Sequence, residues 1–301
     1  MGILSQSRKL LIYRVTGFKI SKQMAGLTDI ARATPTAASG LQARVALYMG
    51  DWANAIKYST EYINAIPLSP RASFAGIWTD ANSNEVAFKL KRSSSNRIGS
   101  VFRATSTAAT TAGIGLVTWY AADGLWNTYD QTNDVRFGAY FKDEPLLNSP
   151  TRLSTHLVAK YAGGTYGTST ENLADVKMFR TGEMYLIRAE AKAQNDLPGA
   201  TADINALRAA RINGYVNIGT YASKDAAITD ILLERYKELA YEGDRFWDLK
   251  RNGKPVVRLA SDAPIPSATT LAAGNFRFVL PIPNTEIQAN PKMAQNPGYA
   301  N

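Results

Sequence analysis

The clearest pattern near the start of the chain is a pair of amphipathic segments. Thr34 and Pro35 supply an N-cap and a proline at the first helical position. Apolar residues follow at spacings of three and four until Gly50, which favours the end of a helix. Asp51 then caps a second stretch with the same spacing, and Pro67 prevents it from continuing. The pattern predicts two antiparallel helices.

A similar pair recurs downstream. Residues 184–191 form one helical stripe, Pro198 and Gly199 indicate a turn, and residues 200–207 form the next stripe. Each unit has about the length of a tetratricopeptide repeat, roughly 34 residues. Because one hairpin cannot bury its apolar stripe alone, we expect the hairpins to stack. Residues 223–242 predict a further helix, with Gly243 as its terminator.

The remaining regions lack helical periodicity. Residues 71–175 combine Gly, Ser, Thr and Asn with isolated aromatic residues, and prolines recur from Pro255 to Pro297. The sequence therefore predicts a mainly α protein of tetratricopeptide-like hairpins, with a loop-rich insertion and an irregular C-terminal tail. We expect one domain over residues 32–301, divided into a hairpin (32–70), the insertion (71–175), a hairpin with the final helix (176–254) and the tail (255–301). Residues 1–31 are interpreted as an atypical or truncated N-terminal segment.

Composition removes several functional classes. The 301 residues contain no cysteine and only one histidine, His156, so disulfide scaffolds, thiol nucleophiles and multi-histidine metal sites are excluded. We interpret His156 as an ordinary surface or partly packed residue. The net charge of +9 is spread along the chain, which does not favour nucleic-acid binding. No apolar run is long enough to cross a membrane.

The motifs of cofactor sites are also missing. No glycine-rich phosphate loop is present, so no nucleotide cofactor is predicted. No metal site is predicted either, although the turn from Asp130 to Asp134 could hold a calcium ion if backbone carbonyls joined its side chains.

Four ordered strings resemble the SusD/RagB family. They are PTAASGLQARVALYMGDWANAI; FRTGEMYLIRAEAKAQND with ATADINALRAAR; ILLERYKELAYEGDRFWDLKRNG; and FVLPIPNTEIQANPKMAQNPGY. The middle string GLWNTYDQTNDVRF is also similar to the family. The resemblance runs from about Arg32 to Tyr299 and is loosest over residues 71–175. It implies the SusD-like α-superhelix as the fold.

The resemblance also implies a function. Members of this family are non-enzymatic glycan-binding lipoproteins of Bacteroidetes-type bacteria, tethered to the outward face of the outer membrane as a lid over a SusC-like TonB-dependent transporter. They normally begin with a lipoprotein signal, an acceptor cysteine and an upstream portion of the helical frame. We expect those parts, including the lipid anchor, to be absent from this chain.

Sugar binding needs flat aromatic faces and planar polar side chains. The insertion supplies both, and the ligand-binding candidates are Trp119, Tyr120, Trp126, Tyr129, Trp78 and Asn127. Asp130, Asn133 and Arg136 are further polar candidates. We expect Trp52 and Trp247 to be buried parts of the scaffold instead.

Two other functions remain open. Glu234, Glu238 and Glu242 share one helical face, and a glycoside hydrolase works with two carboxylates. We expect the neighbouring cations to neutralise them in an ion-pair network that locks the final helix to the tail; these are Arg235, Lys237, Arg245, Lys250 and Arg251. The other alternative is a helical-repeat adaptor that binds only protein, but an adaptor has no need of the insertion.

Overall fold

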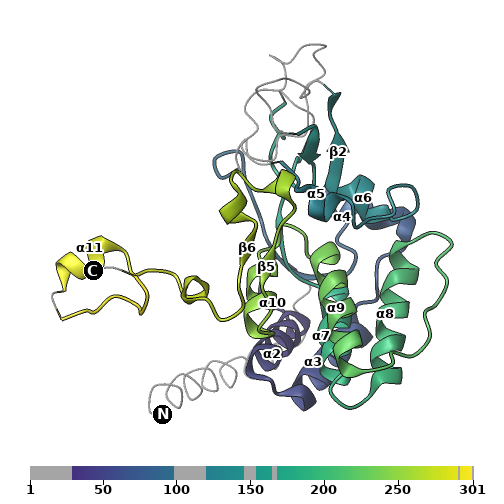
Figure 1. The fold of residues 1–301 in the computed structure, drawn as a ribbon. Coiled ribbons are helices and arrows are strands. Elements are labelled where there is room, and N and C mark those ends of the chain that lie inside the picture. The colour runs from purple at the N-terminus through teal and green to yellow at the C-terminus, as the bar shows by residue number, and fades with distance from the viewer. Residues whose placement is uncertain (1–28, 98–119, 146–153, 165–167, 291, 300–301) are drawn as a thin grey trace. The chain divides into compact units, whose positions relative to one another are not determined.

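The computed structural model describes residues 29–97, 120–145, 154–164, 168–290 and 292–299. The chain forms two compact units, one ending at Ala240 and the other beginning at Tyr241. The first unit holds the helical hairpins and the insertion (Figure 1).

Helices α2 (Pro35–Met49) and α3 (Trp52–Ala65) confirm the first predicted hairpin. The hydroxyl of Thr34 accepts a hydrogen bond of 3.1 Å from the backbone N–H of Ala37, which satisfies one of the free donors of the helix start. Gly50 ends α2 with a φ of 68°, the left-handed conformation that glycine adopts without strain. The local sequence therefore sets both ends of this helix.

The N-cap of α2 gives a first prediction. Replacing Thr34 by alanine (Thr34→Ala) should lower the free energy of unfolding by about 1 kcal/mol, because the N–H of Ala37 loses its acceptor. Urea denaturation measures this change. Thr36→Ala, within the first turn of the same helix, is the matched control and should leave stability unchanged or slightly higher. Equal losses in both variants would contradict the capping role.

The second hairpin consists of α7 (Thr181–Lys192) and α8 (Leu197–Arg211). Pro198 and Gly199 lie in the first turn of α8, whereas the sequence placed them in the connecting turn. The cause is Asp196, whose side chain accepts a hydrogen bond of 2.9 Å from the N–H of Gly199 and so starts the helix earlier. Proline is tolerated there because the first turn needs no N–H donor from it.

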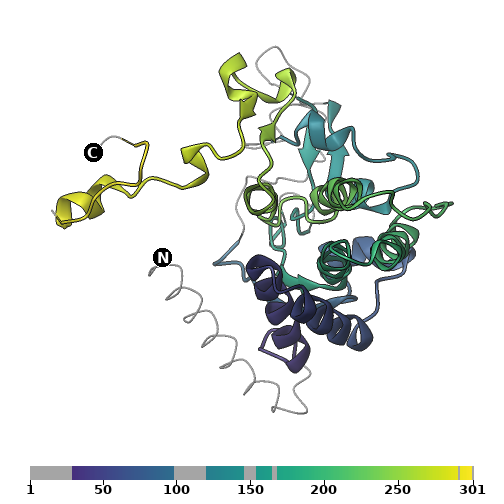
Figure 2. The same ribbon diagram turned by 60° about the horizontal axis from the view of Figure 1, so that its bottom comes forward.

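Helix α7 occupies the middle of the helical frame. It packs against α3 on one side and against α8 and α9 (Lys224–Glu238) on the other, and Figure 2 shows α7, α8 and α9 nearly end-on. Met184 and Ile187 of α7 belong to an apolar cluster shared with the first hairpin, while Leu186 and Ala189 belong to a second cluster shared with α8 and α9. The stacking of two hairpins and a further helix confirms the predicted mainly α, tetratricopeptide-like architecture.

Helix α9 ends at Glu238 rather than beside Gly243, where the sequence placed its end. The difference has a tertiary cause. The backbone carbonyls of Lys237, Glu238 and Ala240 accept hydrogen bonds from Tyr129, Tyr140 and Lys160, respectively, at 2.7, 3.0 and 2.7 Å. Side chains of the insertion thus satisfy the carbonyls that a longer helix would have used.

In its described residues, the region between the hairpins contains only short elements, as its composition predicts. They are α4 (Arg71–Trp78), β1 (Val86–Leu90), α5 (Asp123–Trp126), α6 (Val135–Tyr140), β2 (Phe141–Asp143), β3 (His156–Val158) and β4 (Val176–Arg180). Strand β1 pairs with β4, and β2 pairs with β3, both antiparallel. The short helix α4 had no clear signal in the sequence. Over the described residues, none of the helices combines the length and apolar character that a membrane span requires.

The second unit is irregular apart from short elements, as the prolines predict. It contains α10 (Arg245–Arg251), the pair β5 (Val256–Val257) and β6 (Thr270–Leu271), three 3-10 turns, and α11 (Asn284–Ala289). Phe246 stacks on Phe278 with ring centroids 5.3 Å apart. Trp52 packs on the first apolar cluster as expected, but the burial predicted for Trp247 is wrong, since it is 44% exposed.

Candidate functional site

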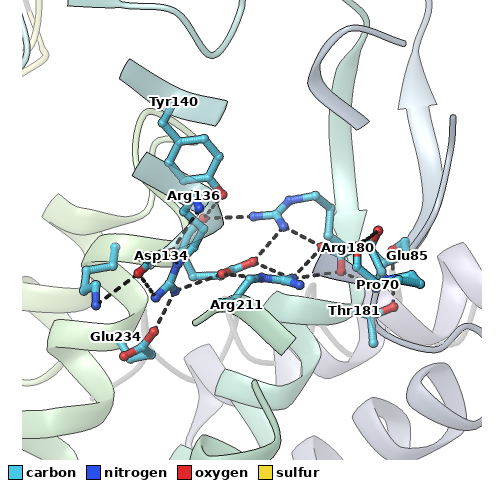
Figure 3. A network of polar contacts seen from close by, with 12 residues as sticks. Pro70, Glu85, Asp134, Arg136, Tyr140, Arg180, Thr181, Arg211 and Glu234 are labelled. Atoms are coloured by element: carbon cyan, nitrogen blue, oxygen red, sulfur yellow. Dashed lines mark hydrogen bonds and ion pairs between the residues drawn. The ribbon is translucent and has the colours of Figure 1, made fainter. Parts of the chain in front are cut away.

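A network of buried charges joins the insertion to the helical frame (Figure 3). Arg136 of α6 contacts Asp134 at 2.7 Å, Glu234 at 2.6 Å and Glu238 at 3.1 Å. Arg180 and Arg211, at the ends of β4 and α8, reach the same Glu238 carboxylate at 2.9 and 3.0 Å and also contact Glu85. We call this set the buried ion network; its members are Glu85, Asp134, Arg136, Arg180, Arg211, Glu234 and Glu238.

Each member of the network is almost completely removed from solvent, with an exposed fraction of 3% or less. Buried charges are tolerated only when they are paired and hydrogen-bonded. Gly182, near the start of α7, has a role here, because a Cβ at this position would collide with the Glu238 carboxylate. The network therefore requires close approach of α7, α8, α9 and the insertion.

The electrostatics of the network bear on the hydrolase alternative. Burial raises the pKa of Glu234, but Arg136, Lys237 and Arg208 lower it by more, to about 2. In the same way, burial raises the pKa of Glu238, and Arg211, Arg180 and Arg136 together hold it well below its ordinary value. A general acid needs a raised pKa and access to substrate. Both glutamates are ionised and buried, so the geometry favours a structural role.

The predicted ion pairing is confirmed for Glu234 and Glu238, and the structure adds partners that the sequence did not name. Besides Lys237, which lowers the pKa of Glu234, these cations come from α6, β4 and α8. The network ties α9 to the insertion and to α8. The physical reason is that Glu234 and Glu238 lie on the buried face of α9, where their neighbours are residues of other segments.

Three of the candidate aromatic residues are buried. Trp126 and Tyr129 are each 6% exposed and lie in a cluster with Phe137 and Phe141. Trp78 is 3% exposed and packs in a second cluster around the ammonium group of Lys160, which lies 4.1 Å from its ring centroid.

In the structure, these three rings support the surface of the insertion rather than forming it. Contact between Trp78, Trp126 or Tyr129 and a sugar stays a prediction, and it would require the rings to leave their clusters.

The other candidates divide between surface and interior. Tyr120 is partly exposed and Asn127 is exposed, whereas Trp119 lies outside the described residues. Arg136 belongs to the buried ion network. The carboxylate of Asp130 accepts hydrogen bonds from the backbone of Thr132 and from both the backbone and the side chain of Asn133.

These hydrogen bonds stabilise the turn after α5. The hydrogen bonds from Asn133 also lower the pKa of Asp130. Among the residues that the structure describes, groups of three or more side chains able to hold a metal ion are not found.

His156, which the sequence marks only as an ordinary residue, lies in a specific arrangement at the surface of the insertion. Its imidazole stacks on the indole of Trp126, with ring centroids 3.8 Å apart and an interplanar angle of 7°. Its Nδ1 atom lies 3.0 Å from Oδ1 of Asp123. In the sequence, His156 stood out only as the single histidine and Trp126 only as part of a family-like string. The pairing of β3 with its neighbours brings these two side chains together.

The strand register places these side chains in rows. Opposite residues of an antiparallel pair share a face, so His156 shares its face with Asp143, while Leu157 shares the other face with Lys142 and Tyr120. The partly exposed Tyr120 and the His156 group therefore belong to neighbouring rows that point to opposite faces. The insertion thus carries two distinct groups of aromatic and polar side chains.

Together, the fold and these surface groups define a scaffold of stacked helical hairpins that carries a recognition insertion. Residues 117–299 match the model of the SusD family, and the chain belongs to that family. The resemblance found in the sequence is thereby confirmed.

Relatives of known sequence or structure agree with this assignment. The SusD-like protein P38 of Formosa agariphila is 30% identical over 173 residues, which are 55% of this chain and 33% of that protein. A SusD superfamily protein from Bacteroides thetaiotaomicron is 25% identical with a TM-score of 0.73, over 90% of this chain and 62% of that one. The chain thus spans about a third of the first protein and less than two thirds of the second.

The fold is also shared with a surface glycan-binding protein. Surface glycan-binding protein A from Bacteroides thetaiotaomicron, solved in complex with laminarihexaose, has a TM-score of 0.70 at 20% identity. The similarity covers 95% of this chain and 70% of that one. At this sequence identity, the comparison shows a common fold and nothing about the ligand of this chain.

Proposed function

We propose that this protein binds an oligosaccharide or polysaccharide at the outer surface of the bacterial outer membrane and leaves it uncleaved. Membership of the SusD family carries the proposal. The insertion supports it with an exposed amide at Asn127, a partly exposed phenol at Tyr120 and the stacked imidazole of His156. Sugars are bound by such combinations of flat rings and planar polar groups.

The proposed mechanism is capture followed by transfer. The helical frame holds the insertion in a fixed position through the buried ion network, so that the surface side chains are arranged before the ligand arrives. The bound glycan then passes to a SusC-like TonB-dependent transporter. A lipid anchor would hold the protein on the outward face of the membrane.

Binding is tested by affinity electrophoresis and calorimetry against neutral and anionic polysaccharides, with laminarihexaose as a defined oligosaccharide. We expect at least one glycan to bind, and Tyr120→Ala to weaken that binding about fivefold or more, because the phenol face is lost. Tyr48→Ala, which removes an exposed tyrosine of α2, is the matched control and should bind as the wild type does. Failure of the folded protein to bind any member of the panel would overturn the proposal.

The same samples test the absence of cleavage. We expect no release of reducing sugar from a bound glycan, because Glu234 and Glu238 are ionised, buried and paired with arginines. Release that disappears in a folded Glu234→Gln or Glu238→Gln variant would establish the hydrolase alternative instead.

A further inference from the structure

Two contacts fix the imidazole of His156 in one orientation. The indole of Trp126 lies parallel beneath it, and the carboxylate of Asp123 lies 3.0 Å from Nδ1. With Nδ1 turned toward Asp123, Nε2 is the ring nitrogen on the other side of the imidazole. The side chain is 23% exposed, and within the described part of the chain Nε2 makes no hydrogen bond. His156 therefore presents an oriented ring edge, with Nε2 as its remaining polar atom.

Polar side chains lie on the two elements that hold this ring. Asn127 follows Asp123 by four residues, and its N–H bonds the Asp123 carbonyl across one helical turn, so both side chains lie on the same side of α5. Asp143 is the cross-strand neighbour of His156 on the β2–β3 ladder. The next residue along, Lys142, belongs to the opposite face, where its ammonium group lies 3.2 Å from Glu144. Two carboxylates of the described residues, those of Asp123 and Asp143, thus lie beside His156.

We infer that His156 and Asn127 form a subsite that binds the hydroxyl groups of a neutral sugar. This inference rests on the proposed function and specifies the chemistry of its ligand. Nε2 forms a hydrogen bond with one hydroxyl, which can donate or accept, and the amide of Asn127 donates to or accepts from its neighbour. Trp126 acts as a positioning residue, because it sets the plane of the imidazole without reaching the surface.

The charge around the subsite sets the class of sugar. The chain carries a net charge of +9, which by itself favours an anionic polysaccharide. Charges further away than about 10 Å are screened at ordinary ionic strength, so groups next to the ligand dominate. Here those groups include two carboxylates, which repel a uronic acid or a sulfated sugar and accept hydrogen bonds from neutral hydroxyls.

The first experiment measures affinity. The probes are laminarihexaose and other neutral hexasaccharides, compared with an oligogalacturonate of the same length. His156→Phe keeps a flat ring on Trp126 but removes Nε2, and we expect about fivefold weaker binding of the best neutral probe. Asn127→Ala should have a similar effect. The matched control, Asn217→Ala, removes an exposed asparagine between α8 and α9 and should change nothing.

The second experiment observes the side chain directly. Because His156 is the only histidine of the chain, a protein purified without a histidine tag gives a single set of imidazole resonances in NMR spectra. We expect these resonances to shift as the neutral probe is added and to follow its binding curve. A histidine with a purely structural role would not respond, and this measurement needs no variant that has to fold.

The outcomes distinguish a failure of the proposed function from a failure of the subsite. If the folded protein binds no probe at all, the proposed function itself fails. If a neutral probe binds while the imidazole resonances stay fixed and His156→Phe retains full affinity, the subsite is refuted and the function stands. If oligogalacturonate binds at least as well as the neutral probes, and Asp123→Asn with Asp143→Asn does not improve it, the assignment to neutral sugars is refuted.

Discussion

Arg136→Met should lower the melting temperature by about 10 °C, the largest effect that we expect from a single substitution. Arg136 contacts three carboxylates, those of Asp134, Glu234 and Glu238, and its side chain is completely buried. Removing one partner of a buried ion pair leaves uncompensated charge and costs about 3–5 kcal/mol. For a chain of this size, each kcal/mol corresponds to roughly 2–4 °C. Differential scanning calorimetry measures the shift.

Two further variants test the cause. Arg136→Lys keeps the positive charge but cannot donate in a fork to several carboxylates, so its loss should be intermediate. Arg32→Met is the matched control, because Arg32 pairs with Asp29 at the surface with its side chain 75% exposed. Its effect should stay within about 0.5 kcal/mol, since surface ion pairs contribute little. A wild-type melting temperature for Arg136→Met would refute the role assigned to the network.

Mild acid should destabilise the protein strongly between about pH 5 and pH 2. The pKa of Glu234 in the folded state is about 2, below the ordinary value of 4.5, because its arginine and lysine neighbours outweigh its burial. A lowered pKa means that the folded state gains stability above the unfolded pKa and loses it as the pH falls through the folded pKa. Glu234 alone accounts for about 3 kcal/mol of this loss. Glu238, whose pKa is also lowered, adds to it.

Urea denaturation at a series of pH values measures this dependence. In Glu234→Gln, stability at pH 7 should be lower than in the wild type, but it should fall less between pH 5 and pH 2.5, because one titrating group is gone. Glu286→Gln, at an exposed position of α11, should keep the wild-type profile. Parallel pH profiles for Glu234→Gln and the wild type would show that the acid sensitivity arises elsewhere.

The candidate site shows how far residue types alone can lead. The insertion was correctly singled out as a region of short elements rich in aromatic residues, but the role of each ring depended on packing. Trp126 and Tyr129 turn inward toward Phe141, while the exposed Asn127 lies between them in sequence. An aromatic side chain in a loop-rich segment is equally compatible with both environments, so only the fold distinguishes them.

The sequence by itself determined the local features of this protein. Caps such as Thr34 and Asp51, the apolar spacing and the proline pattern act over a few residues, so they predict hairpins and tail without knowledge of the fold. The strings that resemble the SusD family likewise indicated the family from the sequence alone.

Only the tertiary structure decided which distant groups meet. Arg136 pairs with Glu234, which lies 98 residues away in the sequence. Three side chains of the insertion donate hydrogen bonds to backbone carbonyls at the C-terminal end of α9. The stack of His156 on Trp126 has the same origin, in strand pairing. Such contacts depend on how whole elements dock, because a buried charge or ring takes its partner from whatever segment the packing brings within a few ångströms.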